Sequence, residues 1–524
     1  MRVNRMRRIL TVGALVSAFC LLFPAGVTMA QTVVQSFDGD SGAGLAECET
    51  GRTHCGFPDM NAAVNGKQVV QVTWQNVSVF DYSGHLLRAT PLATFIRNAG
   101  LDPIPIPRGA NPSPARGPFE LHVAYDEFIS RWIVSATGSS ESLMVSATSD
   151  PMGSWGGVNL SCLAGGPCLN FDPAVHLGYD KNGVYDCGAH VGDSNPNTVL
   201  GVSYDCLAVS SAEVQAIGQG KPPTHVNRAH NMPHEVLPAI DHTQDKAPGA
   251  PAFFLAKTCE RTSPGACQNA ANSSFRWIVD TFTWNGVTGT FNVAGEQLVM
   301  TDVGSKQNKW LYSKPCCGPT ALFPQAGSDV GLRAAESHRL TNVVQFGSHL
   351  YSALGSGPCT AECGSQGTDT NNVAFFVDLD CTKTTACVVS QTAKISGSEF
   401  NPEFPSVGVD AAGNVGIVAI SSTASTDLSI LLWSHRRSDP PNTLNGLTTI
   451  IAGTQPYTCE TDKKFASIAN PAGVDTMLDP LDGTKLWITE QWGNNAARCV
   501  WNTRIIEYQI APAQATKAKS KPKY

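Results

Sequence analysis

Apolar and polar residues alternate with a period of two along many short stretches of this chain, and turn-forming residues separate the stretches. The clearest example is segment 121–155, where three short apolar runs are divided by Asp, Ser and Gly residues. Such alternation, bounded by turn residues, is typical of β-strands joined by hairpins. The segment therefore predicts three strands followed by a closing turn.

The same pattern recurs along the chain as an apolar strand, an Asp with a tight turn, and a second apolar strand. The Asp is clearest at Asp126, Asp180, Asp410 and Asp479. Apart from the wider spacings on either side of the fourth module, the modules start roughly 45 to 65 residues apart, which suits the four-stranded blades of a propeller with insertions. We count seven modules, and six or eight blades remain open because the fourth and fifth are weak. They span residues 68–92, 121–155, 173–214, 252–293, 341–379, 404–433 and 465–510.

Composition favours the same all-β fold class. The 524 residues include 48 Gly and 33 Pro, and long helical periodicities are missing. A chain of this length would normally divide into several cores, but each propeller blade packs only on its neighbours. We therefore predict one disulfide-stabilised β-propeller over residues 67–510. A lead-in segment (31–66) precedes it, and a basic tail (511–524) that we expect to be disordered follows it.

The first thirty residues predict an export signal. Four arginines precede an apolar run over residues 9–23, and small residues ending at Ala30 suit cleavage before Gln31. The apolar run is too short and too early for a membrane anchor. We therefore expect a secreted or periplasmic protein without a transmembrane anchor.

Cysteine usage agrees with export. Sixteen of the 17 cysteines lie outside the signal, and an even number in an oxidising compartment favours disulfides over thiolate metal ligands. No CxxC motif supports the metal alternative. The predicted pairs are Cys48/Cys55, Cys162/Cys168, Cys187/Cys206, Cys259/Cys267, Cys381/Cys387 and Cys459/Cys499, with Cys316, Cys317, Cys359 and Cys363 as a local group.

Charge excludes some partners. Without the four arginines of the signal, 32 basic residues stand against 43 acidic ones, a formal net charge of −11. Such an acidic chain is a poor candidate for binding nucleic acid or anionic membranes. An extracellular glycan or a cell-surface polymer is the expected partner, and the sequence leaves the oligomeric state open.

Residues 149–155, Ser-Asp-Pro-Met-Gly-Ser-Trp, resemble the Asp-box of sialidase-type propellers, with one extra residue before Gly153. Together with segments 125–132, 404–414, 437–444 and 479–505, they make the chain similar to secreted bacterial Asp-box-type propeller proteins. The resemblance implies that Trp155 fills the gap between neighbouring blades. The resemblance does not imply sialidase activity, because we cannot assign the arginine triad, the Tyr–Glu pair and the acidic residue of a sialidase to positions of this sequence.

Several polar residues are candidates for chemistry. Glycoside hydrolysis needs one protonated and one ionised carboxyl group at a defined separation. Most carboxylates that follow a strand, Asp126 and Asp180 among them, are better explained as caps of tight turns. Arg437 and Trp492 are candidates for ligand binding, through a bidentate guanidinium and through stacking on a sugar ring. The candidate catalytic residues are Glu336, His338, Arg339, Glu403 and Asp479.

Two segments are candidates for a divalent metal. The histidine loop at 225–242 could hold zinc, although Pro233 and Pro238 prevent a helix that would align the ligands. An exposed loop with solvated histidines is the alternative. The acidic run at 38–41 could bind calcium, and an ordinary turn is the alternative. The metal candidates of the histidine loop are His225, His230, His234 and His242.

Three functions follow. The leading hypothesis is an exported propeller that binds an extracellular glycan or surface polymer. In one form of this hypothesis the protein also cleaves the polymer, as a glycoside hydrolase or a polysaccharide lyase. The second is a non-catalytic adhesion or protein-interaction scaffold. The third is an exported metalloenzyme that uses the histidine loop.

Overall fold

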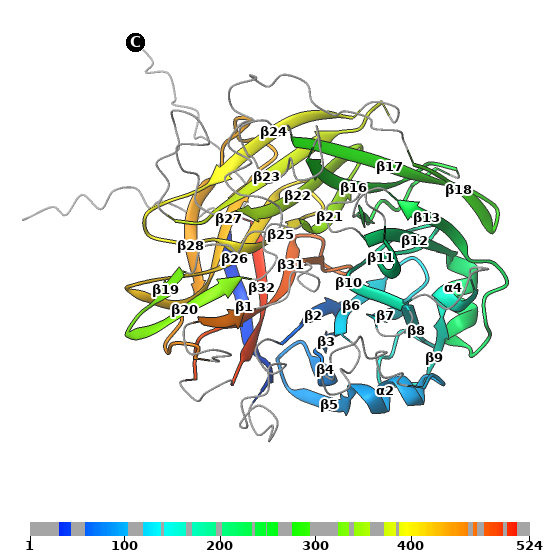
Figure 1. Cartoon of the computed structure of the whole chain (residues 1–524), viewed down its shortest axis with the longest axis horizontal. Helices are drawn as coiled ribbons and strands as arrows, with labels where there is room; N and C mark the ends of the chain where they lie inside the picture. The colour runs from blue at the N-terminus through cyan, green and yellow to red at the C-terminus, as the bar shows by residue number, and fades with distance from the viewer. Residues whose placement is uncertain are drawn as a thin grey trace, which may run out of the picture.

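A computed structural model of the chain describes residues 31–42, 58–102, 119–137, 141–163, 170–194, 202–232, 236–247, 249–259, 275–293, 323–334, 340–356, 371–383, 387–458, 465–468, 476–495 and 500–510. Within these residues the strands form seven blades arranged around a ring, so the prediction of an all-β, seven-bladed propeller is confirmed (Figure 1).

The first three blades are antiparallel meanders whose strands follow chain order from the inside of the ring outward. The first holds β2 (Asn61–Val64), β3 (Gln68–Val72), β4 (Asn76–Asp81) and β5 (Leu86–Pro91). The second holds β6 (Phe119–Asp126), β7 (Arg131–Thr137), β8 (Glu141–Ser146) and β9 (Trp155–Asn159). The third holds β10 (Asn170–Asp180), β11 (Gly183–Ser194), β12 (Val202–Ser210) and β13 (Asn227–Met232).

The next three blades keep this order. The fourth holds β14 (Val236–Pro238), β16 (Ala252–Cys259), β17 (Phe275–Asn285) and β18 (Thr288–Asn292). The fifth holds β21 (Leu340–Phe346), β22 (His349–Ser356), β23 (Val373–Asp380) and β24 (Val388–Ile395). The sixth holds β25 (Glu403–Val409), β26 (Val415–Thr423), β27 (Thr426–His435) and β28 (Asn445–Ile451).

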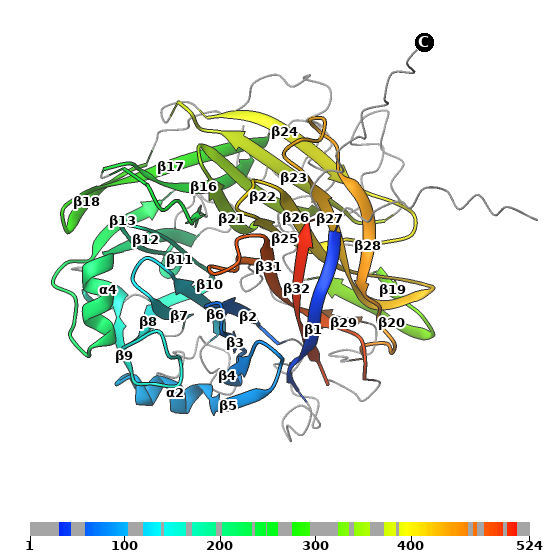
Figure 2. The ribbon, with the colours of Figure 1, turned by 180° about the vertical axis from the view of Figure 1, so that it is seen from behind.

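The seventh blade joins the two ends of the chain. Its sheet runs β30 (Met477–Leu478), β31 (Lys485–Trp492), β32 (Asn502–Ile510) and finally β1 (Gln31–Ser41), so the N-terminal strand is the outer strand of the last blade. Figure 2 shows β1 and β32 side by side. Residues 31–41, which the sequence analysis placed in a lead-in segment, therefore close the ring.

This closure also explains the acidic run at 38–41, which lies in strand β1 rather than in a turn. Asp38 forms an ion pair with Arg504 (2.6 Å), and the Asp40 carboxylate accepts hydrogen bonds from Ser78 (2.7 Å) and Thr73 (3.2 Å) of the first blade. The carboxylates are thus held by strands of the seventh and first blades. We expected an ordinary turn here as the alternative to a calcium loop, and this expectation is wrong.

Two short strands depart from the regular blade. β15 (Ile240–Asp241) leaves the fourth blade and pairs in parallel with β21 of the fifth. β29 (Phe465–Ile468) pairs with β20 (Ser328–Ala334) in a small separate sheet that also holds β19 (Phe323–Gln325). The seventh module was expected to start at residue 465, and this start is wrong because β29 belongs to that small sheet.

Three short helices lie between strands. α2 (Leu92–Asn98) follows the first blade, α3 (Leu160–Leu163) follows the second, and α4 (Ser211–Gly218) connects β12 to β13. Leu92, Phe95 and Ile96 of α2 are buried in the core of the first and second blades. Among the described residues, no helix is long and apolar enough to cross a membrane.

Apolar side chains fill the spaces between neighbouring blades. Between the sixth and seventh blades, one cluster joins Leu432, Ile488 and Tyr508, all with 0–1% exposure. Burial of each such side chain contributes about 1.5–3 kcal/mol relative to leaving it in water. Each blade is thus stabilised mainly by its two neighbours, as expected for a propeller.

Polar side chains join neighbouring inner strands at matched heights. The Asn61 side-chain oxygen of β2 accepts a hydrogen bond from the Val123 amide of β6 (3.3 Å). The Asn342 side chain of β21 binds both the carbonyl (2.7 Å) and the amide (3.0 Å) of Val407 in β25. The inner strands therefore run side by side in one direction, and they end on one face of the ring, here called the exit face.

The Asp-box-like turn connects β8 to β9 and packs beside the first blade, with a small cavity between the turn and β4. Asp150 caps the turn by accepting a hydrogen bond from the Met152 amide (2.9 Å). The Trp155 ring packs edge-on against Phe95 of α2, with 4.9 Å between ring centroids. The structural role expected for Trp155 is confirmed.

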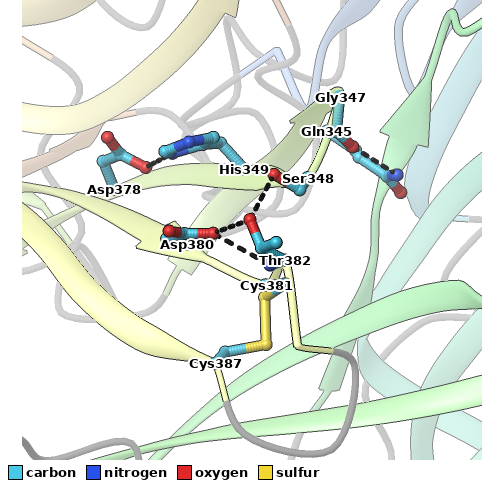
Figure 3. Close-up of a disulfide and its surroundings, with 9 residues drawn as sticks. All are labelled: Gln345, Gly347, Ser348, His349, Asp378, Asp380, Cys381, Thr382 and Cys387. Carbon is cyan, nitrogen blue, oxygen red and sulfur yellow. Dashed lines mark hydrogen bonds and ion pairs between the residues drawn. A yellow bond between two sulfur atoms is a disulfide. The ribbon is translucent and has the colours of Figure 1, made fainter.

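Two of the predicted disulfides lie wholly within the described residues, and both are confirmed. Cys187–Cys206 joins paired positions of β11 and β12. Cys381–Cys387 closes the turn between β23 and β24, where the Thr382 hydroxyl lies between Ser348 and Asp380 (Figure 3). Both bridges thus link neighbouring strands of a single blade.

The other predicted disulfides each involve at least one cysteine outside the described residues, so their pairings stay predictions. Cys162 is disulfide-bonded, in agreement with its expected role, but its predicted partner Cys168 belongs to the undescribed segment 164–169. Cys259 ends β16, and its predicted partner Cys267 is likewise not described. The signal (1–30) and the basic tail (511–524) also lie outside the described part of the chain. The further cysteines that lie outside it are Cys48, Cys55, Cys316, Cys317, Cys359, Cys363, Cys459 and Cys499.

Replacing Gln31 of β1 by Ala is expected to weaken ring closure. Its buried side-chain amide donates to Gly446 O and Thr448 Oγ1 (both 2.8 Å), and it accepts from Ser434 Oγ (2.8 Å) in the sixth blade. Loss of these buried bonds should cost about 2–3 kcal/mol of unfolding free energy, measured by urea denaturation. The exposed neighbour Thr32 provides the control, Thr32→Ala; equal effects of both substitutions would contradict this role of Gln31.

Candidate functional site

An Asp or Asn follows the inner strand of nearly every blade and caps the turn to the second strand. Asp180 Oδ1 accepts hydrogen bonds from the amides of Asn182 (2.7 Å) and Gly183 (3.1 Å). The pattern holds for every blade except the fifth, whose turn is Gly347-Ser348. The capping residues are Asn65, Asp126, Asp180, Asp241, Asp410 and Asp479.

Each Asp cap has a second carboxylate oxygen, and the partner of this oxygen differs among the blades. Asp410 Oδ2 accepts from Asn414 within its own turn (2.8 Å). Asp479 Oδ2 accepts from Tyr82 of the first blade (2.9 Å) and from Trp487 (3.3 Å). In the sixth and seventh blades, therefore, both oxygens of the cap are occupied.

Lys246 joins two caps of the third and fourth blades. Its ammonium lies 2.7 Å from Asp180 Oδ2 and 2.9 Å from Asp241 Oδ2, and all three side chains are at most 5% exposed. Burial alone lowers the pKa of Lys246, but the two carboxylates outweigh burial and raise it above its ordinary value. The lysine therefore stays charged, and it neutralises part of a buried acidic cluster.

His242 follows β15 directly, and its side chain contacts the turn of the second blade. Its Nδ1 lies 2.8 Å from Glu127 Oε1, and the Tyr179 hydroxyl donates to Glu127 Oε2 at 3.0 Å. The side chains of His242 and Glu127 remain 16% and 13% exposed, whereas Tyr179 is 1% exposed. The carboxylate and the imidazole are thus held in place by a buried tyrosine and are themselves open to solvent.

Asp126 is the exception among the caps. Its Oδ1 accepts from the amides of Phe128 (2.9 Å) and Ile129 (3.3 Å), but its buried Oδ2 has no hydrogen-bond partner in the described part of the chain. Burial, followed by the charge of Glu127, raises the pKa of Asp126 to about 8. This carboxyl group is therefore mainly neutral at pH 7.

We call these residues the exit-face cluster: Asp126, Glu127, Tyr179, Asp180, Asp241, His242 and Lys246. Burial lowers the pKa of His242, yet Glu127 reverses this effect and raises it above its ordinary value. A carboxyl group with a raised pKa, a second carboxyl group and an imidazole thus converge from three blades. Such a convergence of shifted pKa values is typical of functional sites.

A second polar cluster is buried between the second and third blades. Glu141 accepts hydrogen bonds from Ser135 (2.9 Å) and Thr137 (3.4 Å), and it lies close to Asp186. Burial, followed by the charge of Asp186, raises the pKa of Glu141 well above its ordinary value. The His122 ring, 5.8 Å from that of His176, lies close enough to stabilise the Asp186 charge. All four titratable residues are at most 4% exposed, so this cluster is closed to ligands.

The predicted catalytic residues are not brought together where the structure describes them. Glu403 is buried at the start of β25, where it accepts a hydrogen bond from Asn372. Asp479 follows β30 on the exit face, at the other end of the inner strands, and acts as a turn cap. Glu336, His338 and Arg339 lie outside the described residues.

The histidines predicted as metal ligands are spread over separate partners. His225 lies 3.7 Å from Glu213, His230 lies 2.9 Å from Asp205, and His242 binds Glu127. His234 lies outside the described residues. Among the described His, Cys, Asp and Glu side chains, no group of three or more is placed to hold a metal ion.

The two predicted ligand-binding residues are not part of the exit-face cluster. The Arg437 guanidinium stacks 5.7 Å from the centroid of Phe346, beside the turns of the fifth and sixth blades. Trp492 is half-buried, and the Arg504 guanidinium lies 5.6 Å from its ring centroid. Both aromatic rings are covered on one side by an arginine.

Three residues of the exit-face cluster were not singled out from the sequence: Glu127, Tyr179 as a hydrogen-bond donor, and Lys246. The Tyr-Asp pairs that end β6 and β10 were a usable signal, because they place tyrosine and carboxylate at the same height in neighbouring blades. No comparable signal marks Lys246, whose partners Asp180 and Asp241 lie on two different strands.

No protein-family model matches the chain, and no curated protein matches it. Among solved structures, it is similar to the Trypanosoma rangeli sialidase in complex with sialic acid, with 7% identity and a TM-score of 0.33, over 83% of this chain and 57% of the sialidase chain. The chain thus spans little more than half the length of that sialidase.

Two further solved structures are similar to the chain. The full extracellular region of plexin A4 has 8% identity and a TM-score of 0.43, over 86% of this chain and 46% of plexin. The Kuenenia stuttgartiensis hydrazine synthase has 10% identity and a TM-score of 0.37, over 83% and 93%. At these identities the likeness concerns the fold alone, and the resemblance to sialidase-like propellers extends no further.

Replacing Lys246 by Met should strongly destabilise the protein, because two buried carboxylates would lose their counter-charge. Removing one partner of a buried ion pair costs about 3–5 kcal/mol. Thermal unfolding at pH 7 checks this, with the exposed Lys181→Met as matched control. A Lys246→Met variant as stable as the control would show that the ion pairs contribute little.

Glu141→Gln tests the raised pKa of the buried Glu141. Since the folded-state pKa of Glu141 is raised, its stabilising contribution is complete below the unfolded pKa and is lost as pH rises through the folded pKa. Wild type should therefore lose stability relative to Glu141→Gln as pH rises above about 4.5, the ordinary glutamate value. Urea unfolding from pH 4.5 to 9 measures this, and parallel pH curves for the two proteins would count against the raised pKa.

Proposed function

We propose that this protein is an exported propeller that binds an extracellular glycan or a cell-surface polymer on its exit face. The observation that carries the proposal is the Glu127–His242 pair, which is partly exposed although the groups that hold it are buried. A carboxylate and an imidazole in fixed positions suit hydrogen bonds to sugar hydroxyls, because one accepts and the other donates or accepts. Pre-organisation of both lowers the entropic cost of binding.

Binding is better supported than cleavage. A glycosidase needs a protonated and an ionised carboxyl on the two sides of the scissile bond. Asp126 has a raised pKa, as the protonated carboxyl would need, but it is 0% exposed. A lyase that used His242 with Tyr179 meets the same obstacle, since Tyr179 is 1% exposed. A bound glycan can therefore contact Glu127 and His242 but neither buried partner.

A non-catalytic interaction scaffold is the second candidate. It is favoured by the other caps of the exit face, since Asp410 and Asp479 use both oxygens within the protein. A protein partner would then recognise the surface of these turns rather than the exit-face cluster.

A glycan array, followed by a depolymerisation screen of the bound polysaccharides, tests the proposal. We expect binding without cleavage, reduced at least ten-fold in Glu127→Gln and in His242→Ala because each removes one fixed contact. The matched control is His85→Ala, which breaks a similar but exposed pair with Asp81 (3.1 Å) in the first blade. If both cluster variants still bound the glycan, the glycan would bind elsewhere on the protein. If the wild-type protein bound no glycan, the interaction scaffold would be the better supported function.

A further inference from the structure

The exit-face cluster holds more negative than positive charge. Its four carboxyl groups face one ammonium and one imidazole, and Lys246 already serves both Asp180 and Asp241. Even with Asp126 neutral and His242 protonated, three carboxylates stand against two cations. Because buried charge is costly without a counter-charge, the cluster favours an additional cation.

Asp126 provides an independent sign of such a ligand. Its Oδ1 is turned toward the amides of Phe128 and Ile129, while Oδ2 is fully buried and has no hydrogen-bond partner in the described structure. The charges of Glu127 and Asp180 act on this carboxyl group, which places it within the cluster. Asp186 and Glu490 also have buried carboxyl oxygens without a partner in the described structure, but Asp126 is directly followed by the partly exposed Glu127, and a cation at Glu127 would stabilise the ionised form of Asp126.

The oxygens that remain accessible suit an organic ammonium better than a metal ion. Calcium takes six to eight oxygen ligands, and no described group of three or more His, Cys, Asp or Glu side chains is placed to hold a metal. Most carboxylate oxygens of the cluster are committed to turn amides or to Lys246. A protonated amine needs only one or two acceptors, and each oxygen of the partly exposed Glu127 accepts one hydrogen bond, from His242 or Tyr179, and can accept a second.

We propose that the exit-face cluster binds the protonated amine of an amino sugar, with Glu127 as its direct acceptor and Asp126 as a buried carboxyl that ionises when the amine binds. The inference rests on the proposed glycan binding and names its ligand class. N-acetylated or neutral sugars lack the charge that the cluster favours. Anionic sugars such as sialic acid are disfavoured by the same carboxylates.

Calorimetric titration of the full chain with glucosamine tetrasaccharide and with its fully N-acetylated counterpart tests the proposal. We expect the deacetylated form to bind at least ten-fold more tightly, and its affinity to fall as salt concentration rises. Glu127→Gln should abolish this preference. The control variant Asp150→Asn, at an exposed turn cap of the second blade, should retain it.

Proton release gives a second readout. Titrations near pH 7 in buffers of different ionisation enthalpy should show protons released on binding by wild type, and fewer by Asp126→Asn, in which the amide replaces the carboxyl and keeps the turn cap. Salt dependence and proton release in wild type need no variant, so the test stands if a variant fails to fold.

The outcomes separate the two proposals. Equal binding of both oligosaccharides would overturn the ammonium site while glycan binding stood. If neither oligosaccharide bound while neutral glycans bound on the array, the ammonium site would again be overturned and the proposed glycan binding would stand. A preference for the deacetylated form that Glu127→Gln retained, or equal proton release by wild type and Asp126→Asn, would overturn the assignment of the amine to this cluster.

Discussion

A buried carboxylate that closes the turn after an inner strand determines how the exit face is built. Burying a carboxylate costs free energy unless hydrogen bonds compensate it, and two backbone amides provide part of this compensation at Asp180. The second oxygen needs a further partner. Asn414, Tyr82 and Lys246 meet this need at four positions, because Lys246 serves both Asp180 and Asp241, and Asp126 lacks such a partner in the described structure. The proposed ligand site thus arises where one repeat of the pattern is left incomplete.

This pattern depends in turn on a closed ring. The apolar faces of each blade are covered only by the neighbouring blades, so an open array would leave two faces in water. The pairing of β1 with β32 removes that problem, and the buried Gln31 side chain extends the closure into the sixth blade. Similar side-chain bonds join inner strands elsewhere, as between Asn342 and Val407. The inner strands therefore end at a common height, which is why turn residues of different blades can meet.

Much of the fold was predictable because its signals are local. Alternation and turn residues identify the seven modules, Asp126 and Asp180 read as turn caps, and Trp155 reads as a structural residue. The pairing of β1 with β32 was not predictable in this way, since alternation reports burial but not which strand is the partner. For the same reason residues 31–41 looked like a lead-in, and β29 looked like the start of the seventh blade.

The candidate site was less predictable than the fold. Asp126 and Asp180 follow the same kind of strand and look equivalent in sequence, yet only Asp180 has a lysine partner. His242 was selected for its neighbouring histidines, but its partner, Glu127, lies 115 residues away in the chain. His242 directly follows β15, and a two-residue strand gives no periodic signal.

Glu127 is expected to contact a bound sugar amine on the exit face. A crystal structure of the protein soaked with glucosamine tetrasaccharide tests it most directly. We predict a sugar ammonium within hydrogen-bond distance of the Glu127 carboxylate, beside His242. Ordered sugar bound elsewhere on the propeller, with the Glu127–His242 pair uncovered, would contradict the account.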